Sequence, residues 1–224
     1  MKKKILSVLV VLVVVILGSY TVKVTETMGR TSKNLVVVID PGHGGFDPGK
    51  VGVTGSLEKD INLSISYKIK QRLEKRGIQV IMTRTQDEAV CQESDTNKKS
   101  KDMQNRISVM NVSNAAIGVS IHQNSFTDSS SKGAQVFYYT GSKEGESLAN
   151  TIQSNIKETL QDNNHRVAKS NDQYYILRKA KCPVVIVECG FLSNYMEEAL
   201  LMEEDYQDKM AEGISKGILS YLGE

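Results

Sequence analysis

The sequence predicts an α/β protein in three layers, with a mostly parallel twisted sheet of about six strands and helices on both faces. Strand-like and helical segments alternate from residue 34 onward. Several strand-like segments are apolar throughout, such as "VVVI" at 36–39 and "VVIV" at 184–187. Continuous apolar strands are typical of parallel sheets that are buried on both faces. With 224 residues, 40% of them hydrophobic, the chain is long enough to bury one sizeable core.

The first strand and the first helix have the clearest patterns. Residues 34–40 form an apolar strand that ends in an acid. Residues 57–77 predict an amphipathic helix, with Ser56 as its N-cap and Gly77 at its end. The four-residue spacing of its apolar side chains carries that prediction: Ile61, Ile65, Ile69 and Leu73.

The remaining elements follow in alternation. Further strands are predicted at residues 78–83, 115–122, 133–140, 174–177 and 183–190. The segment 133–140 alternates in polarity and is typical of a half-exposed or edge strand. Further helices are predicted at residues 100–114 and 144–160, with one or two more over 195–222. No internal repeat or second ligand-binding domain is evident.

The N-terminus predicts export. "MKKK" precedes the apolar run "ILSVLVVLVVVIL", which is the layout of a secretory signal. With residues 18–22 added, the run just reaches the length that spans a bilayer, and no small-residue cleavage site follows. We therefore expect an uncleaved membrane anchor at 1–22, in preference to a cleaved signal. A polar linker at 23–33 and an exported folded domain at 34–224 would follow, on the outer face of the cytoplasmic membrane or in the cell wall.

Charge and cysteine content exclude several classes. The net charge of +2 and the absence of a basic stripe with aromatics argue against nucleic-acid binding. Lys98, Lys99 and Lys101 form a short basic patch, predicted to be a solvated loop. The three cysteines are an odd number without motif spacing, so no disulfide framework is expected.

Unusual polar residues follow three of the apolar strands. His43 and His122 lie at or just beyond two strand ends, and Glu188 closes a third. Sites in open α/β sheets collect at this edge, and the helix after the first strand begins with Glu58. His43, Glu58 and His122 together would suit one zinc ion with a position left for water, whose pKa the metal lowers to about 7. Glu188 would then be the proton-transferring carboxylate.

Each residue also has a plainer interpretation. A single histidine after a strand is more often a hydrogen-bonded structural residue than a ligand. Glu58 could simply stabilise the helix dipole, and His165 is predicted to be an ordinary loop residue. The glycine-rich segment "DPGHGGFDPG" lacks the third glycine of a dinucleotide fingerprint, where Asp47 stands, and the Gly-Lys-Ser/Thr end of a P-loop. Because all four polar residues, His43, Glu58, His122 and Glu188, are expected at the same edge of the sheet, the metal site is favoured over these plainer interpretations.

Six ordered segments resemble those of a known family: "VVVIDPGHGGFDPG", "LEKDINL", "VIMTR", "QNRISVMN", "VSIHQNS" and "PVVIVECGFLSN". The chain from residue 34 to its end resembles the zinc-dependent N-acetylmuramoyl-L-alanine amidases of the Amidase_3 type. The resemblance implies hydrolysis of the amide between N-acetylmuramic acid and the first L-alanine of the peptidoglycan stem peptide. It also implies zinc ligation by His43, Glu58 and His122 and catalysis by Glu188. Arg84 and Asn124 fall in motif positions that imply supporting or substrate-facing roles.

The architecture narrows the resemblance further. A single anchored catalytic domain, without a wall-binding module, resembles the sporulation branch of the family. That branch implies a role in spore cortex, where a deacetylase completes muramic-δ-lactam, and it leaves open an accessory protein that controls activity. The segment 86–99 is short and polar, which suggests an open groove rather than an occluding helix. Two alternatives remain at this point: a zinc peptidase cutting within the stem, and a non-catalytic wall-binding regulator.

Overall fold

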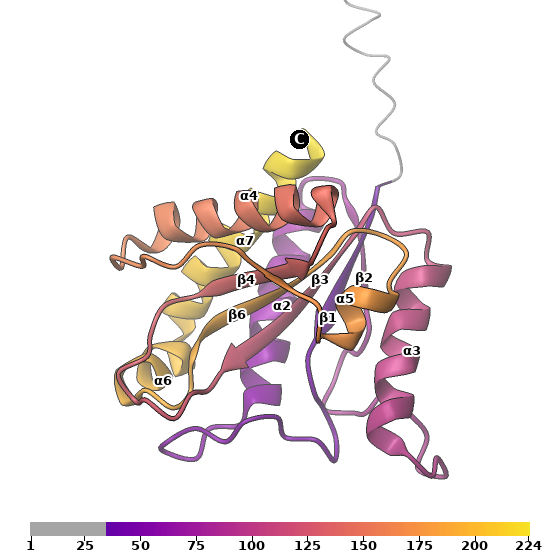
Figure 1. Cartoon of the computed structure of the whole chain (residues 1–224), viewed down its shortest axis with the longest axis horizontal. Coiled ribbons are helices and arrows are strands. Elements are labelled where there is room, and N and C mark those ends of the chain that lie inside the picture. The colour runs from indigo at the N-terminus through magenta and orange to yellow at the C-terminus, as the bar shows by residue number, and fades with distance from the viewer. Residues whose placement is uncertain (1–34) are drawn as a thin grey trace, which may run out of the picture. The chain divides into compact units, whose positions relative to one another are not determined.

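Six strands form one sheet in the order β2-β1-β3-β6-β4-β5 in the computed structural model, which describes residues 35–224 (Figure 1). The pairs β1–β2, β1–β3, β3–β6 and β4–β5 are parallel, and β4 runs antiparallel to β6. The predicted mostly parallel sheet is therefore confirmed. The strand bounds are β1 (Val36–Pro41), β2 (Gln79–Met82), β3 (Ile117–Asn124), β4 (Gln135–Tyr139), β5 (Lys169–Asn171) and β6 (Val184–Phe191).

Helices cover both faces of the sheet, as predicted (Figure 1). α2, α4 and α7 pack on one face, while α3 and α5 pack on the other. Each face of the sheet has its own apolar core, and strand β1 contributes side chains to both. Val37 and Ile39 lie in the larger core and Val38 lies in the smaller one, because successive side chains of a strand point to opposite faces. The helix bounds are α2 (Glu58–Glu74), α3 (Lys98–Val112), α4 (Lys143–Leu160), α5 (Tyr175–Lys179), α6 (Tyr195–Met202) and α7 (Glu204–Leu222).

The start of α2 differs from the prediction. Its N-cap is Leu57, which makes no side-chain capping bond. Ser56 instead donates its hydroxyl to Glu198 Oε1 at 2.6 Å. The Ser56 hydroxyl therefore binds a buried carboxylate on α6 instead of capping α2.

The segment 174–177 is also not a strand. Asn171 Oδ1 accepts hydrogen bonds from the backbone N–H groups of Gln173 and Tyr174, which turns the chain into α5. Ile176 and Leu177 then pack into the smaller core from a helix. Periodicity does not separate helix from strand in so short an apolar run. The edge strand next to β4 is β5, which the sequence did not predict, so β4 is a partly exposed strand but not an edge strand.

The terminal segment forms two helices, α6 and α7, which meet at Glu203. The basic patch is not a loop, because Lys98, Lys99 and Lys101 lie in the first turn of α3. Cys91, Cys182 and Cys189 are free thiols. The predicted anchor and the predicted linker both lie outside the described residues. Within 35–224, every helix is too short or too polar to cross a bilayer.

Candidate active site

The carboxyl ends of β1, β3 and β6 meet at one cavity of about 510 Å³. The fold brings His43, Glu58, His122 and Glu188 together in its wall. His43 follows β1, His122 lies near the end of β3, and Glu188 pairs with His122 across the neighbouring strand β6. The four residues proposed from the sequence therefore line one space.

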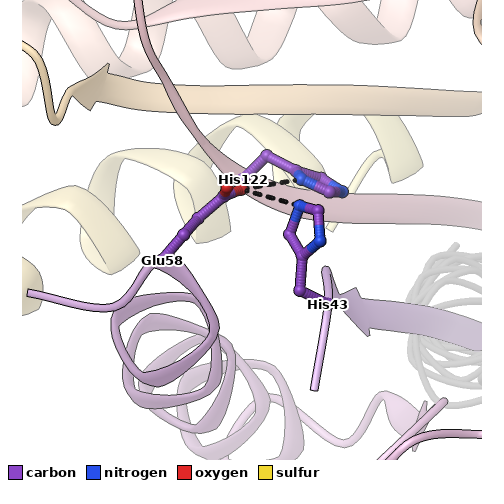
Figure 2. A group of neighbouring side chains, drawn as sticks. All are labelled: His43, Glu58 and His122. Carbon is purple, nitrogen blue, oxygen red and sulfur yellow. Dashed lines mark hydrogen bonds and ion pairs between the residues drawn. The ribbon is translucent and has the colours of Figure 1, made fainter. Parts of the chain in front are cut away.

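Three of these side chains point at one another (Figure 2). Glu58 Oε1 lies 3.2 Å from His43 Nε2 and 2.9 Å from His122 Nδ1. The two imidazole rings meet edge to face, with centroids 5.0 Å apart. All three candidate ligand atoms lie within 4.8 Å of one another.

This donor set fits a small divalent cation. Ligand atoms about 2.0–2.2 Å from a tetrahedral zinc ion lie about 3.3–3.6 Å apart, slightly more than the 3.2 and 2.9 Å between Glu58 Oε1 and the two histidine nitrogens. Two imidazole nitrogens and a carboxylate form a ligand set used by catalytic zinc. The three residues could therefore hold a metal without a change of backbone.

Two contacts fix the orientation of His43. Its Nδ1 lies 3.1 Å from Asp47 Oδ2, which leaves Nε2 directed at Glu58. A carboxylate on the far nitrogen orients a metal-ligating imidazole and increases its basicity. The backbone carbonyl of His43 accepts a hydrogen bond from Arg106 Nη2 at 2.6 Å.

The backbone at His43 is strained. Its φ is +61°, and Gly44 and Gly45 follow with φ of +135° and +56°. A non-glycine residue in the left-handed region is uncommon, and such strain concentrates at functional sites. Gly44 and Gly45 permit the turn, because glycine adopts a positive φ without steric cost.

Two other glycines make room for ligands. A Cβ on Gly42 would lie 2.2 Å from His122 Cε1. A Cβ on Gly49 would lie 2.5 Å from Glu58 Oε2 and 2.7 Å from His43 Cδ2. Gly42 therefore leaves room for His122, and Gly49 leaves room for Glu58 and His43.

Buried hydrogen bonds hold Glu58, which is only 2% exposed. Oε1 accepts from the backbone N–H of Gln123 at 3.1 Å, and Oε2 accepts from that of Lys50 at 2.7 Å. Asn62, fully buried, donates to Gly42 O and to Glu58 Oε1. Burial would raise the pKa of Glu58, but hydrogen bonds and charge from His122 and His43 outweigh burial and lower that pKa strongly.

Glu188 is buried without a partner for its Oε2 atom. Burial, reinforced by the charge of Glu58, raises the pKa of Glu188 to about 7, although His122 and His43 act in the opposite direction. A carboxyl group with a pKa near neutrality, facing a cavity, is suited to accept and donate protons.

The structure gives different positions to the other three residues considered in the sequence analysis, Arg84, Asn124 and His165. Arg84 is buried and donates to the carbonyls of Pro41, Gly42, Lys59 and Gln86, so its guanidinium braces the histidine loop. Asn124 lies at the end of β3 in the cavity wall. His165 is an exposed loop residue outside the cluster, in agreement with its prediction.

Sequence reasoning missed Arg106. Its guanidinium lies in the interior, 2.7 Å from Asp40 Oδ1 and 2.5 Å from Asp102 Oδ2. It also donates to the carbonyls of Pro41 and His43. The only local signal was one arginine on the apolar side of a helix, next to Ile107.

Two adjacent acids on α6 tie down loops at the same sheet edge. Glu197 accepts from the backbone N–H groups of Gly133 and Phe191. Glu198 accepts from the backbone and hydroxyl groups of Thr54 and Ser56. The loop between His43 and Glu58 is therefore held from a helix far along the chain.

A candidate cation cluster beside an unpaired carboxyl group, at the edge of an α/β sheet, defines the class of metal-assisted hydrolases. Residues 37–220 match the Amidase_3 family, described as N-acetylmuramoyl-L-alanine amidase. The chain belongs to this family and is an N-acetylmuramoyl-L-alanine amidase, an enzyme of peptidoglycan.

Similar proteins agree with this assignment. A germination-specific N-acetylmuramoyl-L-alanine amidase of Bacillus subtilis (strain 168) is 38% identical over 192 residues, which cover 84% of this chain and 80% of that protein. The CwlD amidase of Clostridioides difficile, solved in complex with the GerS lipoprotein, is 39% identical with a TM-score of 0.82. That match covers 85% of this chain and 99% of the other. An N-acetylmuramoyl-L-alanine amidase of Clostridium difficile 630 is 35% identical with a TM-score of 0.77, over 86% and 99% of the two chains.

Proposed function

We propose that this amidase is zinc-dependent and cleaves the bond between N-acetylmuramic acid and L-alanine in spore-cortex peptidoglycan. His43, Glu58 and His122 hold one zinc ion, and Glu188 transfers the proton. The observation that carries the proposal is the convergence of two imidazole nitrogens on Glu58 Oε1, beside the unpaired Oε2 of Glu188.

When bound, zinc acts as a Lewis acid that polarises the amide carbonyl and lowers the pKa of water. Glu188 accepts a proton from the attacking water and then donates it to the amide nitrogen. The new C–O bond leaves the lactyl carboxylate on the sugar, and the C–N bond breaks to free the amino group of L-alanine. Asp47 keeps the His43 ring in position through Nδ1 throughout.

Arg84 and Asn124 have different parts in this proposal. Arg84 is a positioning residue, since all its hydrogen bonds go to backbone carbonyls around the histidine loop. Asn124 faces the cavity and contacts substrate. Residues 86–97 form turns rather than a helix, which leaves the cavity open to a polymeric glycan.

The cellular setting is part of the proposal. The germination-specific relative supports a cortex role in which the bared muramic acid passes to a deacetylase that forms muramic-δ-lactam. The relative solved with a lipoprotein supports an accessory protein that controls activity or metal loading. The apolar N-terminal run supports export and anchoring of the catalytic domain on the outer face of the membrane.

Mass spectrometry of digested peptidoglycan tests the reaction. We expect intact stem peptides with a free N-terminal L-alanine, together with glycan strands that keep their lactyl groups. Shortened stems would instead identify a peptidase, and undigested sacculi that retain the protein would identify a wall-binding regulator.

Metal analysis of the same preparation tests the ion. We expect about one zinc per chain, loss of activity with a chelator, and recovery on adding zinc back. His43→Ala and His122→Ala should reduce the zinc content, with Glu212→Gln on the surface of α7 as a control that retains it. Full occupancy in either histidine variant refutes the ligand assignment.

A further inference from the structure

Two lysines, Lys50 and Lys99, line the catalytic cavity. Lys98 precedes Lys99 in the first turn of α3, and its Nζ lies 5.9 Å from the centroid of the half-exposed Phe46 ring. We call Lys50, Lys98 and Lys99 the lysine rim.

The fold gains little from these charges. The positive end of the helix dipole disfavours cations in a first turn. α3 has no acid there, whereas α2, α4, α6 and α7 each have two. Within residues 35–224, the rim forms a single ion pair, between Lys99 Nζ and Asp47 Oδ1 at 3.4 Å. The Lys99 side chain is 74% exposed, so this pair contributes little.

Three carboxyl groups line the cavity, those of Asp47, Glu58 and Glu188. They would offset the charge of a bound zinc ion, so the lysines supply positive charge in addition to that of the metal. A peptidoglycan stem peptide is itself acidic, because it ends in a carboxylate and carries a further carboxyl on its second residue, a D-glutamate. That second residue follows the L-alanine whose amide is cut, so its carboxyl enters or borders the same cavity.

We propose that the lysine rim binds the glutamyl carboxylate of the stem peptide, so that the enzyme selects stems with a free carboxylate over stems in which it is amidated. This inference rests on the proposed function, because it places the stem peptide in this cavity. Amidation replaces a charge by a neutral amide of nearly the same shape, so only the electrostatic contact is lost.

Steady-state kinetics on two muramoyl-peptide substrates tests the selection. The substrates differ only in whether the glutamyl carboxyl is free or amidated. In Lys98→Gln/Lys99→Gln, we expect KM for the free-acid substrate to rise about tenfold at low ionic strength, with kcat within twofold. KM for the amidated substrate should change little, and salt should reduce the difference between wild type and variant.

Lys75→Gln/Lys181→Gln is the matched control. It removes the same charge from two exposed lysines at the opposite edge of the sheet: Lys75 directly follows α2, and Lys181 lies three residues before β6. Its KM for both substrates should equal that of the wild type. The rim variant should also unfold at the same temperature as the wild type or higher, since it relieves an unfavourable charge at the start of α3.

Binding of the free stem tripeptide, measured by calorimetry on the zinc-loaded protein, separates this proposal from the reaction. Weaker tripeptide binding in the rim variant but not in the control supports carboxylate binding by the lysine rim. This result would hold even if the wild type released no stem peptide from peptidoglycan. If the wild type hydrolyses the substrate and the rim variant has unchanged KM and unchanged tripeptide binding, the proposed role of the lysine rim is refuted and the proposed amidase reaction still stands. Equal losses on the free and amidated substrates also overturn it.

Discussion

Gly42→Ala should separate metal binding from folding. A Cβ at this position would lie 2.2 Å from His122 Cε1 and 2.4 Å from Nε2. Ordinary contact begins near 3.4 Å, so the ring has to move by about 3.4 − 2.2 = 1.2 Å. The backbone of residue 42 is not free to retreat, because its N–H donates to Ile121 O while its carbonyl accepts from Asn62 and Arg84.

A shift of that size is several times the tolerance of a metal–ligand distance, which is about 0.2 Å. We therefore expect zinc affinity to fall at least about hundredfold, equivalent to roughly 2.7 kcal/mol. The unfolding free energy of the metal-free protein should fall by only about 1–3 kcal/mol, as for other overpacked sites.

Competition with a chelator measures the affinity, and denaturation of the metal-free protein measures the stability. Gly118→Ala is the control, because its Cβ would crowd Val184 and Met110, away from the cluster. It should lose similar stability and keep wild-type zinc affinity. Wild-type affinity in Gly42→Ala would refute the assignment of His122 as a ligand held in place by a missing side chain.

Other expected outcomes concern proton transfer by Glu188, the buried ion pair of Arg106 with Asp40, and the hydrogen bond from Ser56 to Glu198 on α6. Glu188→Gln should keep its zinc and lose about 10²–10⁴-fold in kcat, and unchanged turnover would remove Glu188 from the mechanism. Arg106→Met leaves Asp40 buried and unpaired, so denaturant unfolding should show a loss of about 3–5 kcal/mol. Burial would raise the pKa of Asp40, but Arg106 and hydrogen bonds from neighbouring hydroxyls outweigh burial and lower it below 3.8. The resulting stability is present above about pH 4 and is lost as the pH falls through the folded-state pKa, a dependence that Asp40→Asn should weaken in denaturation series. Ser56→Ala should cost about 1.5–3 kcal/mol through its bond to Glu198, and much less in a Glu198→Gln background, whereas equal losses in both would contradict the tie.

The layers of the fold could be predicted from the sequence because the apolar pattern within a single segment indicates whether it is a buried strand or an amphipathic helix. The run at 36–39 shows burial on both faces, and the four-residue spacing from Ile61 to Leu73 shows one buried helix face. The same reasoning placed His43, His122 and Glu188 together, because parallel strands bring their carboxyl ends to one edge.

Contacts between distant segments were beyond such reasoning. The helix pattern does not reveal what Arg106 contacts, because its partner Asp40 lies on β1, 66 residues away. Ser56 has the chemistry of a helix cap, yet its hydroxyl goes to Glu198, 142 residues away. Asp47 lies in a loop without periodicity, so only its four-residue spacing from His43 hinted at their contact.

The left-handed backbone at His43 constrains how this position can vary. Asparagine and aspartate tolerate a φ near +60° better than other residues with side chains, and β-branched residues tolerate it worst. An exchange to asparagine removes the imidazole and preserves the course of the loop, whereas valine disturbs both at once. His122, in β3, and Glu58, the first residue of α2, do not have a positive φ and carry no such restriction. A substitution at position 43 therefore disturbs the loop backbone as well as the candidate ligand set, whereas one at position 58 or 122 changes the ligand set without that backbone strain.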